Sequence, residues 1–224
     1  MKREIILTAD GSTTIQIVDW DEQYHSIHGA VNEAYHVFVR TGLHYYLQQT
    51  ASKKIKILEM GFGTGLNAFI TALEADDKSL QILYEGVEAY PVKIEEAQAM
   101  NYATQIDKTK NALFTRLHSS VWETTQEISD TMRLLKRKLN FLDIRADEAY
   151  DLIYFDAFGP RVQPELWTVN MFKSMFNALT PNGVLVTYSA KGSVRRAMQE
   201  VGFTVERLPG PPGKREMLRA SKLL

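Results

Sequence analysis

The sequence predicts an α/β protein built on a mostly parallel sheet that ends in an antiparallel hairpin. A strand-like run at residues 55–60 leads through alternating glycines into a helix at 66–75, which is the strand–turn–helix unit of doubly wound sheets. Apolar runs and helical segments then alternate along the chain, as a parallel sheet requires. The last two expected strands, 203–208 and 216–220, are joined by a segment too short for a crossover helix, so they should pair antiparallel.

The remaining elements of this unit follow from local pattern. Gly202 is placed to end a helix, Pro91 to begin one, and residues 181–183 to form a turn. The pattern is poorest between 102 and 145. We expect strands at 81–88, 113–117, 150–155 and 184–188, and helices at about 92–100, 122–128, 165–179 and 194–201.

The N-terminal segment, residues 1–50, is expected to be a cap formed by a β-hairpin and a helix, next to a larger unit at 51–224. The hairpin spans residues 5–18 and turns at Asp10-Gly11. The helix runs from about Ala30 to Gln49, with Glu33, His36 and Arg40 away from its apolar face. That face is formed by Val31, Ala34, Tyr35, Phe38 and Val39.

Composition excludes several classes of protein. The net charge of −1 gives no overall attraction to nucleic acid or membrane, so RNA binding would need a local basic patch. The chain has no cysteine, which excludes disulfides, thiolate metal sites and cysteine nucleophiles. We expect no leader, no membrane segment and a cytoplasmic location. Four of the five histidines precede residue 50, but no clear carboxylate completes a ligand set, so no metal is expected.

The glycine turn indicates the cofactor. A dinucleotide-binding fingerprint, G-x-G-x-x-G, would need glycine at position 66, where Leu66 stands. The observed E-x-G-x-G-x-G pattern resembles that of class I S-adenosylmethionine (SAM) methyltransferases, which have a Rossmann-like sheet. A turn that is only structural remains the alternative. The candidate cofactor residues here are Glu59, Gly61, Gly63, Gly65 and Asn67.

Two further positions complete the expected cofactor site. Glu88 ends the next strand, about twenty residues beyond the glycine turn, where an acid binds ribose hydroxyls. A solvated acid at a strand end is the alternative. In this fold an acid or amide near residue 140 meets the adenine, with Asp143 or Asn140 as candidates.

The loop D-A-F-G-P at residues 156–160 indicates the reaction. It resembles the loops of amine methyltransferases, in which a carboxylate accepts the N–H of a neutral amine and takes its proton after transfer. Asp156 is the candidate for this role, Phe158 can stack on a base, and Pro160 stiffens the loop. The alternative for Asp156 is that it caps the next helix.

The turn of the C-terminal hairpin, residues 209–215, should stand on the rim of the site because it follows the end of a strand that runs parallel to the others. Lys214 and Arg215 are therefore expected to bind phosphate, with a solvated basic turn as the alternative. A second basic run lies at 133–138.

Several stretches together resemble one family, the stand-alone relatives of the methyltransferase domain of the tRNA wobble-uridine modification enzyme MnmC. The resemblance runs from about Asp10 to Lys222. It includes D-G-S, E-M-G-F-G-T-G-L-N, G-P-P-G-K-R-E-M, Y-F-D-A-F-G-P-x-x-x-P-E-L-W-T and Y-H-S-x-x-G-A-x-x-E-x-x-H-V-F, the last of which makes Tyr24 and His25 candidate substrate contacts.

The resemblance implies SAM-dependent N-methylation of 5-aminomethyl(-2-thio)uridine in the anticodon loop of tRNA, giving the 5-methylaminomethyl form. Family roles carry over to the three glycines and Glu88 for the cofactor, and to Asp156 beside the amine. MnmC also has a flavin oxidoreductase domain that makes the amine. This chain has one glycine-turn unit, so we expect no flavin and an amine made elsewhere.

Two other functions remain open. A SAM-dependent N-methyltransferase of a small-molecule or protein amine would keep every cofactor residue and change only the acceptor. A non-catalytic SAM- or RNA-binding module would bind SAM without turnover, and the acidic positions count against it. Leu66 disfavours a nicotinamide oxidoreductase. The sequence does not indicate an oligomeric state.

Overall fold

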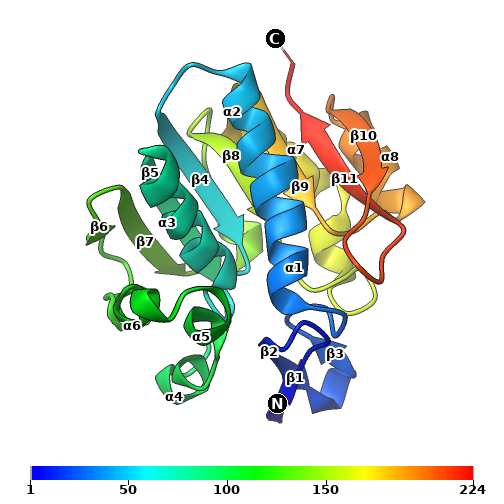
Figure 1. Cartoon of the computed structure of the whole chain (residues 1–224). Coiled ribbons are helices and arrows are strands. Elements are labelled where there is room, and N and C mark those ends of the chain that lie inside the picture. The colour runs from blue at the N-terminus through cyan, green and yellow to red at the C-terminus, as the bar shows by residue number, and fades with distance from the viewer. Residues whose placement is uncertain (1, 224) are drawn as a thin grey trace.

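The computed structural model describes residues 2–223, so the outer limits of the two expected units, Met1 and Leu224, lie outside it. Its centre is an eight-stranded sheet in the order β10-β11-β9-β8-β4-β5-β7-β6 (Figure 1). The strands are β4 Lys54–Met60, β5 Gln81–Glu88, β6 Gln126–Ser129, β7 Met132–Lys138, β8 Tyr150–Phe155, β9 Leu179–Thr187, β10 Thr204–Pro209 and β11 Glu216–Ser221.

The strand directions confirm the predicted sheet. The central strands β7, β5, β4, β8 and β9 run parallel, while β11 is antiparallel to both β9 and β10. The chain leaves β4 toward β5 and later returns to the other side of β4 as β8. This change of direction is the topological switch point, beside which open α/β sheets bind their ligands.

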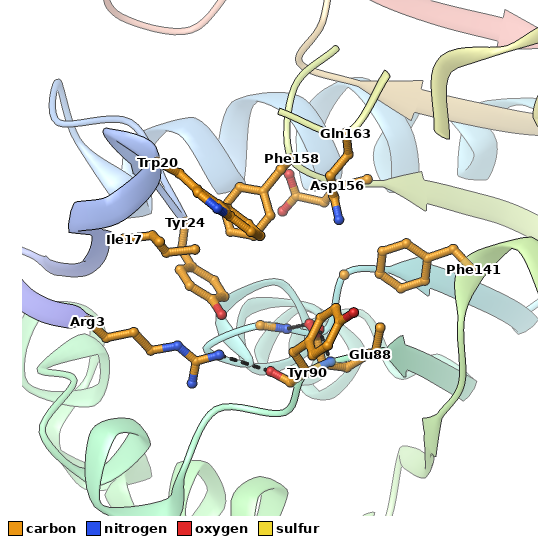
Figure 2. A pocket seen from close by; sticks show the side chains of 14 residues that line it. Arg3, Ile17, Trp20, Tyr24, Glu88, Tyr90, Phe141, Asp156, Phe158 and Gln163 are labelled. Carbon is orange, nitrogen blue, oxygen red and sulfur yellow. Dashed lines mark hydrogen bonds between the residues drawn. The ribbon is translucent and has the colours of Figure 1, made fainter. Parts of the chain in front are cut away.

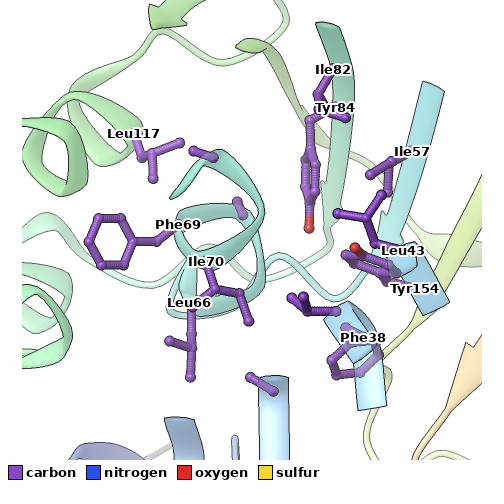
Figure 3. Close-up of a cluster of buried hydrophobic side chains, with 14 of the residues drawn as sticks. Phe38, Leu43, Ile57, Leu66, Phe69, Ile70, Ile82, Tyr84, Leu117 and Tyr154 are labelled. Atoms are coloured by element: carbon purple, nitrogen blue, oxygen red, sulfur yellow. The ribbon is translucent and has the colours of Figure 1, made fainter. Parts of the chain in front are cut away.

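Alternate residues along the strands supply two apolar layers. One contains Ile57 and Tyr154, which pack with α3 (Leu66–Lys78), α6 (Asn111–Ser119) and the N-terminal helix (Figure 3). The other contains Leu58 and Phe155, which pack with α7 (Val169–Ala178) and α8 (Gly192–Glu200). The sheet is therefore buried from both sides at its centre, as an α/β sheet must be.

The N-terminal segment forms a small sheet and a long helix. β1 (Arg3–Leu7), β2 (Thr13–Ile17) and β3 (Glu22–Gln23) make the sheet, and β1 and β2 form the predicted hairpin. The helix runs through α1 (Ala30–Ala34), a π-helical stretch (Tyr35–His44) and α2 (Tyr45–Gln49). It appears as one blue rod across the sheet in Figure 1. The predicted helix bounds are confirmed.

The side that Glu33 faces differs from the prediction. Glu33 is only 6% exposed, although we expected it away from the apolar face. Its Oε2 accepts a hydrogen bond from the Ser26 amide at 2.7 Å, and its Oε1 pairs with Lys214. These partners compensate the buried charge, so Glu33 turns toward the site.

The predictions were also wrong between 102 and 145. Residues 113–117 lie in helix α6, because Phe114 and Leu117 bury one helical face. Residues 126–128, expected as part of a helix, belong to edge strand β6, whose Ile128 points into the core. Short helices α4 (Ile94–Gln98) and α5 (Tyr102–Ile106) precede them.

Three smaller features complete the fold. The expected turn at 181–183 is an irregularity inside β9, marked by a φ of +64° at Asn182 and by a register shift against β8. A short 3₁₀ helix, Pro164–Trp167, opens the helical region before α7. Between residues 2 and 223, no helix is both long and apolar enough to cross a membrane.

Candidate active site

A cavity lies at the switch point, beside the carboxyl ends of β4 and β8. This is the place where open α/β sheets bind small-molecule ligands. The glycine turn and Glu88 form one side of it, and Asp156 and Phe158 the other (Figure 2). The N-terminal segment closes a third side. The residues it contributes are Arg3 and Ile17 from the small sheet, and Trp20 and Tyr24 from the chain that follows β2.

The glycine turn lines the cavity with backbone. A side chain at Gly61 would place its Cβ 2.6 Å from the carbonyl oxygen of Asp156, and one at Gly63 would place it 2.9 Å from the Tyr24 ring. Both residues also have positive φ, of 95° and 48°. Only glycine allows β4, β8 and Tyr24 to approach so closely.

The buried Glu88 carboxylate fits the expected ribose site. It is 8% exposed, and it accepts hydrogen bonds from the amides of Gly63 at 3.0 Å and Tyr90 at 2.9 Å. Burial raises the pKa of Glu88, and these hydrogen bonds oppose that shift. Because each carboxylate oxygen can accept more than one hydrogen bond, acceptor capacity remains for a ligand diol.

Three aromatic side chains, Trp20, Tyr24 and Phe158, form an aromatic wall. The Phe158 ring makes edge contacts with Trp20 at 5.7 Å and with Tyr24 at 5.1 Å between centroids. The Phe158 backbone is fixed by Trp167, whose indole N–H donates to its carbonyl at 2.8 Å. The wall is therefore a preorganised apolar surface on which a planar group can stack.

Asp156 stands between the glycine turn and the aromatic wall. It follows β8 directly, and its Oδ2 accepts a hydrogen bond from Asn67 Nδ2 at 2.8 Å. Burial raises the pKa of Asp156 to about 7, with a further contribution from the charge of Glu33, while Asn67 and Lys214 oppose the shift. A carboxyl group with this pKa can accept and release a proton near neutral pH.

The structure places Glu59 and Asn67 beneath the cavity rather than in its wall. Their side chains are 1% and 2% exposed, and neither lines the cavity. Asn67 Nδ2 also donates to Glu59 Oε1, at 2.9 Å. Burial, followed by the nearby charge of Asp156, raises the pKa of Glu59 well above its ordinary value.

Other predicted site residues lie outside the cavity. Gly65 packs against the His118 ring. His25 is buried against Thr14, and burial lowers its pKa to about 4. Asp143 is exposed, and Phe141, two residues earlier, lines the cavity instead.

Pro160, Lys214 and Arg215 line a second cleft on the outer side of the Asp156 loop, together with Tyr188 and Lys191. Lys214 is not free there, since it pairs with the buried Glu33 and lies 4.0 Å from the centre of the Tyr188 ring. Arg215 and Lys191 are exposed.

The basic run at 133–138 occupies strand β7, and only Arg133 and Lys138 among its four basic residues are exposed. Lys136 is 2% exposed and donates to the carbonyl of His118 at 2.8 Å, and Arg137 pairs with Glu85 and Glu123.

Several cavity residues were not predicted from the sequence. Arg3, Ile17 and Trp20 come from the N-terminal segment, whose position depends on long-range packing. Gln163 lies beside Asp156, and its buried Oε1 has no hydrogen-bond partner among the described residues. The nearby P-E-L-W stretch, which belongs to the family resemblance, was the feature of the sequence that pointed to this loop. Among residues 2–223, no group of three histidine or acidic side chains could hold a metal ion.

Comparison with known proteins agrees with this architecture. A family model described as S-adenosyl-L-methionine-dependent methyltransferase matches residues 104–223. The tRNA 5-methylaminomethyl-2-thiouridine biosynthesis bifunctional protein MnmC of Paracidovorax citrulli is 29% identical over 215 residues, which cover 89% of this chain and 32% of that protein. MnmC of Burkholderia thailandensis is 29% identical over 233 residues, covering 96% and 34%. The chain thus spans about a third of the length of these relatives.

Solved structures give the same picture. MnmC2 from Aquifex aeolicus superimposes with a TM-score of 0.78 at 25% identity, covering 98% of this chain and 70% of that one. Spermidine synthase from Thermotoga maritima has a TM-score of 0.56 at 14% identity, covering 99% and 74%, and is similar in fold alone. The predicted fold class and the resemblance to the MnmC methyltransferase domain are confirmed.

Proposed function

The chain belongs to the S-adenosyl-L-methionine-dependent methyltransferase family, and from that premise we propose that it N-methylates the 5-aminomethyl group of the wobble uridine in tRNA. The base carries oxygen or sulfur at position 2, and the product is the 5-methylaminomethyl form. MnmC relatives named for this modification support the choice of acceptor. The observation that carries the proposal is a proton-accepting Asp156 between a SAM-type glycine turn and an aromatic wall.

The cavity residues fit SAM. Gly61 and Gly63 present backbone where a Cβ would already collide with its neighbours, and Glu88 offers a buried carboxylate to a ribose diol. SAM supplies a methyl group on a sulfonium sulfur, which passes to a neutral amine nitrogen while the S–C bonding electrons return to sulfur. We assign Gly61, Gly63 and Glu88 to the cofactor.

Asp156 is the residue proposed to act on the acceptor. In its ionised form it accepts an N–H of the amine, which aims the nitrogen lone pair, and it takes the proton that the methylated nitrogen releases. Its pKa of about 7 makes it a competent acceptor at neutral pH. Phe158 and the aromatic wall provide a surface for the base, which must leave its stack to reach the cavity.

The second cleft supports a polynucleotide acceptor. It continues outward from the Asp156 loop and exposes Lys191 and Arg215, which suit the phosphates flanking a flipped base. We propose the anticodon loop of tRNA as the partner and the cytoplasm as the location. Residues 1–50 would serve as the wall that completes the cavity.

Labelled SAM and tRNA that carries the unmethylated aminomethyl group test the proposal. Label should appear in 5-methylaminomethyl nucleosides, and tRNA that already carries the methyl group serves as the matched control. Label on a protein or a small amine instead would favour the alternative acceptors. SAM binding without any transfer would favour a non-catalytic module.

A further inference from the structure

Asn67 connects three elements that meet below the cavity. It is the second residue of α3, and its Nδ2 donates both to Glu59 Oε1 at the end of β4, at 2.9 Å, and to Asp156 Oδ2 after β8, at 2.8 Å. One amide nitrogen therefore bridges two carboxyl groups on neighbouring strands.

The orientation of this amide is fixed by its surroundings. Both hydrogens of Nδ2 are used, one for each carboxyl group. If the amide were flipped, Oδ1 would face Oδ2 of the Asp156 carboxylate, to which a carbonyl cannot donate. Within residues 2–223, Oδ1 of Asn67 has no hydrogen-bond partner. The side chain thus leaves one buried acceptor unpaired, which is costly, and keeps its donors on the carboxyl groups.

We propose that Asn67, held in turn by the buried Glu59, is a positioning residue that clamps Oδ2 of Asp156 and leaves its Oδ1 to face the acceptor amine. The sequence pattern had suggested instead that both residues contact the cofactor. The geometry separates them from it, because neither lines the cavity that Gly61, Gly63 and Glu88 form. No hydrogen bond reaches Oδ1 from any described residue.

The clamp acts within a set of charged groups on several elements. Glu33 on α1 and Lys214 on the hairpin loop shift the pKa of Asp156 in opposite directions. The Tyr188 hydroxyl donates to the carbonyl of Ala157 at 2.9 Å and so holds the loop. The raised pKa of Glu59 disfavours a second negative charge beside Asp156, while Glu59 Oε1 still accepts from Asn67.

This inference rests on the proposed function, in which Asp156 accepts the proton of the amine. The variant Asn67→Leu keeps the branched outline of the side chain, with larger methyl groups in place of the amide, and removes the donor. We expect kcat to fall by about 10- to 100-fold and the acid limb of its pH profile to move up by about one unit, because a donor to the ionised form is lost. The Kd for SAM should stay within about threefold of the wild-type value.

Matched variants separate positioning from packing. Glu59→Leu should shift the profile in the same direction, and Glu59→Gln, which keeps an acceptor oxygen, should restore part of the loss. Thr71→Val is a buried change on the same helix. It should leave kcat and its pH profile as in the wild type. A rise in the Kd for SAM that matches the fall in kcat, with an unmoved pH profile, would make Asn67 a cofactor ligand and overturn the inference.

A titration that does not depend on turnover distinguishes a failure of the proposed Asn67 clamp from a failure of the proposed function. In protein labelled with ¹³C at aspartate carboxyl groups, the Asp156 signal is identified by its loss in Asp156→Asn. Its titration midpoint should rise by about one unit in Asn67→Leu and in Asn67→Ala. An unchanged midpoint in both sinks the clamp whatever the acceptor proves to be. Absence of methyl transfer to tRNA by the wild type would refute the proposed function alone.

Discussion

Asp156 owes its reactivity to its position rather than to its chemical type. An aspartate in water is ionised far below neutral pH, whereas burial beside Glu33 brings the pKa of this one to about 7. The same surroundings determine which protonation states the active site can use, and they lead to two predictions about this residue.

The rate of methyl transfer should depend on the ionisation of Asp156. Below pH 7 the proton acceptor becomes protonated, so the single-turnover rate should fall about tenfold per pH unit. Asp156→Ala should lower the rate at least about 100-fold at pH 8, remove this limb and leave SAM binding intact. Rapid quench with labelled SAM measures the rate. Equal loss of SAM binding and transfer would show that Asp156 is structural.

The stability of the protein should also depend on the ionisation of Asp156. The pKa of Asp156 is raised on folding from its ordinary value of 3.8 to about 7, so the stability it contributes is fully present below about pH 4 and lost as pH rises through 7. Asp156→Asn, always neutral, should melt roughly 10 °C above the wild type at pH 8. Calorimetry at pH 4 should show no such gap. A constant gap at both pH values would contradict the raised pKa.

The residues of the candidate site could be predicted from the sequence where a short motif determines their position. Gly61, Gly63, Glu88 and Asp156 follow strand ends, and parallel strands bring such positions to one edge. Glu59 and Asn67 belong to the same motif, yet they lie beneath the cavity. How deeply these two side chains are buried depends on the register of β4 against β8, which no local sequence pattern specifies.

At the scale of elements, the loop 209–215 illustrates how context changes a role. Strand direction places it at the carboxyl edge of the sheet, where Lys214 and Arg215 line the second cleft rather than the cavity. Lys214, however, is held by Glu33 and packs on Tyr188, so its charge is already neutralised by a partner 181 residues away in sequence. Arg215, the next residue, is exposed.

This difference predicts separate effects of two neighbouring substitutions. Arg215→Met should lower the slope of log Kd for tRNA against log salt by about one unit, because a phosphate contact is lost. Lys214→Met should leave the slope unchanged and instead lower the melting temperature, because Glu33 keeps a buried, unpaired charge. Filter binding at several salt concentrations and calorimetry measure the two effects. Equal salt slopes for the two variants would contradict the assignment.

Elements with strong periodicity could be predicted, and those that depend on pairing could not. The strand Gln81–Glu88 matches its predicted bounds. The stretch between 102 and 145 was misread because α6 is short and β6 is an edge strand, whose register only its partner β7 defines.

At the scale of the molecule, the N-terminal segment is part of both the core and the site. Phe38 and Leu43 from its helix pack in the same layer as Ile57, Ile70 and Tyr154 (Figure 3). The segment before that helix supplies Trp20 and Tyr24 of the aromatic wall. The sequence indicated a cap from hairpin and helix patterns, but its docking depends on contacts far apart in the chain.

This packing predicts that residues 51–224 do not fold alone. The fragment should lack a cooperative melting transition, because its sheet would expose the face that the helix covers. Phe38→Ala in the full chain should cost about 3–5 kcal/mol of stability. Ile5→Ala, at a site 43% exposed, is the matched control and should cost little. A fragment with sharp, dispersed NMR signals would show instead that the cap is dispensable for folding.

The most direct test of the central claim, wobble-uridine N-methylation, is nucleoside mass spectrometry of tRNA from a strain that lacks this protein. The account predicts loss of the 5-methylaminomethyl nucleosides with accumulation of the 5-aminomethyl form. Wild-type protein should restore the methylated form, and Asp156→Ala should not. An unchanged nucleoside profile in the deletion strain would contradict the claim.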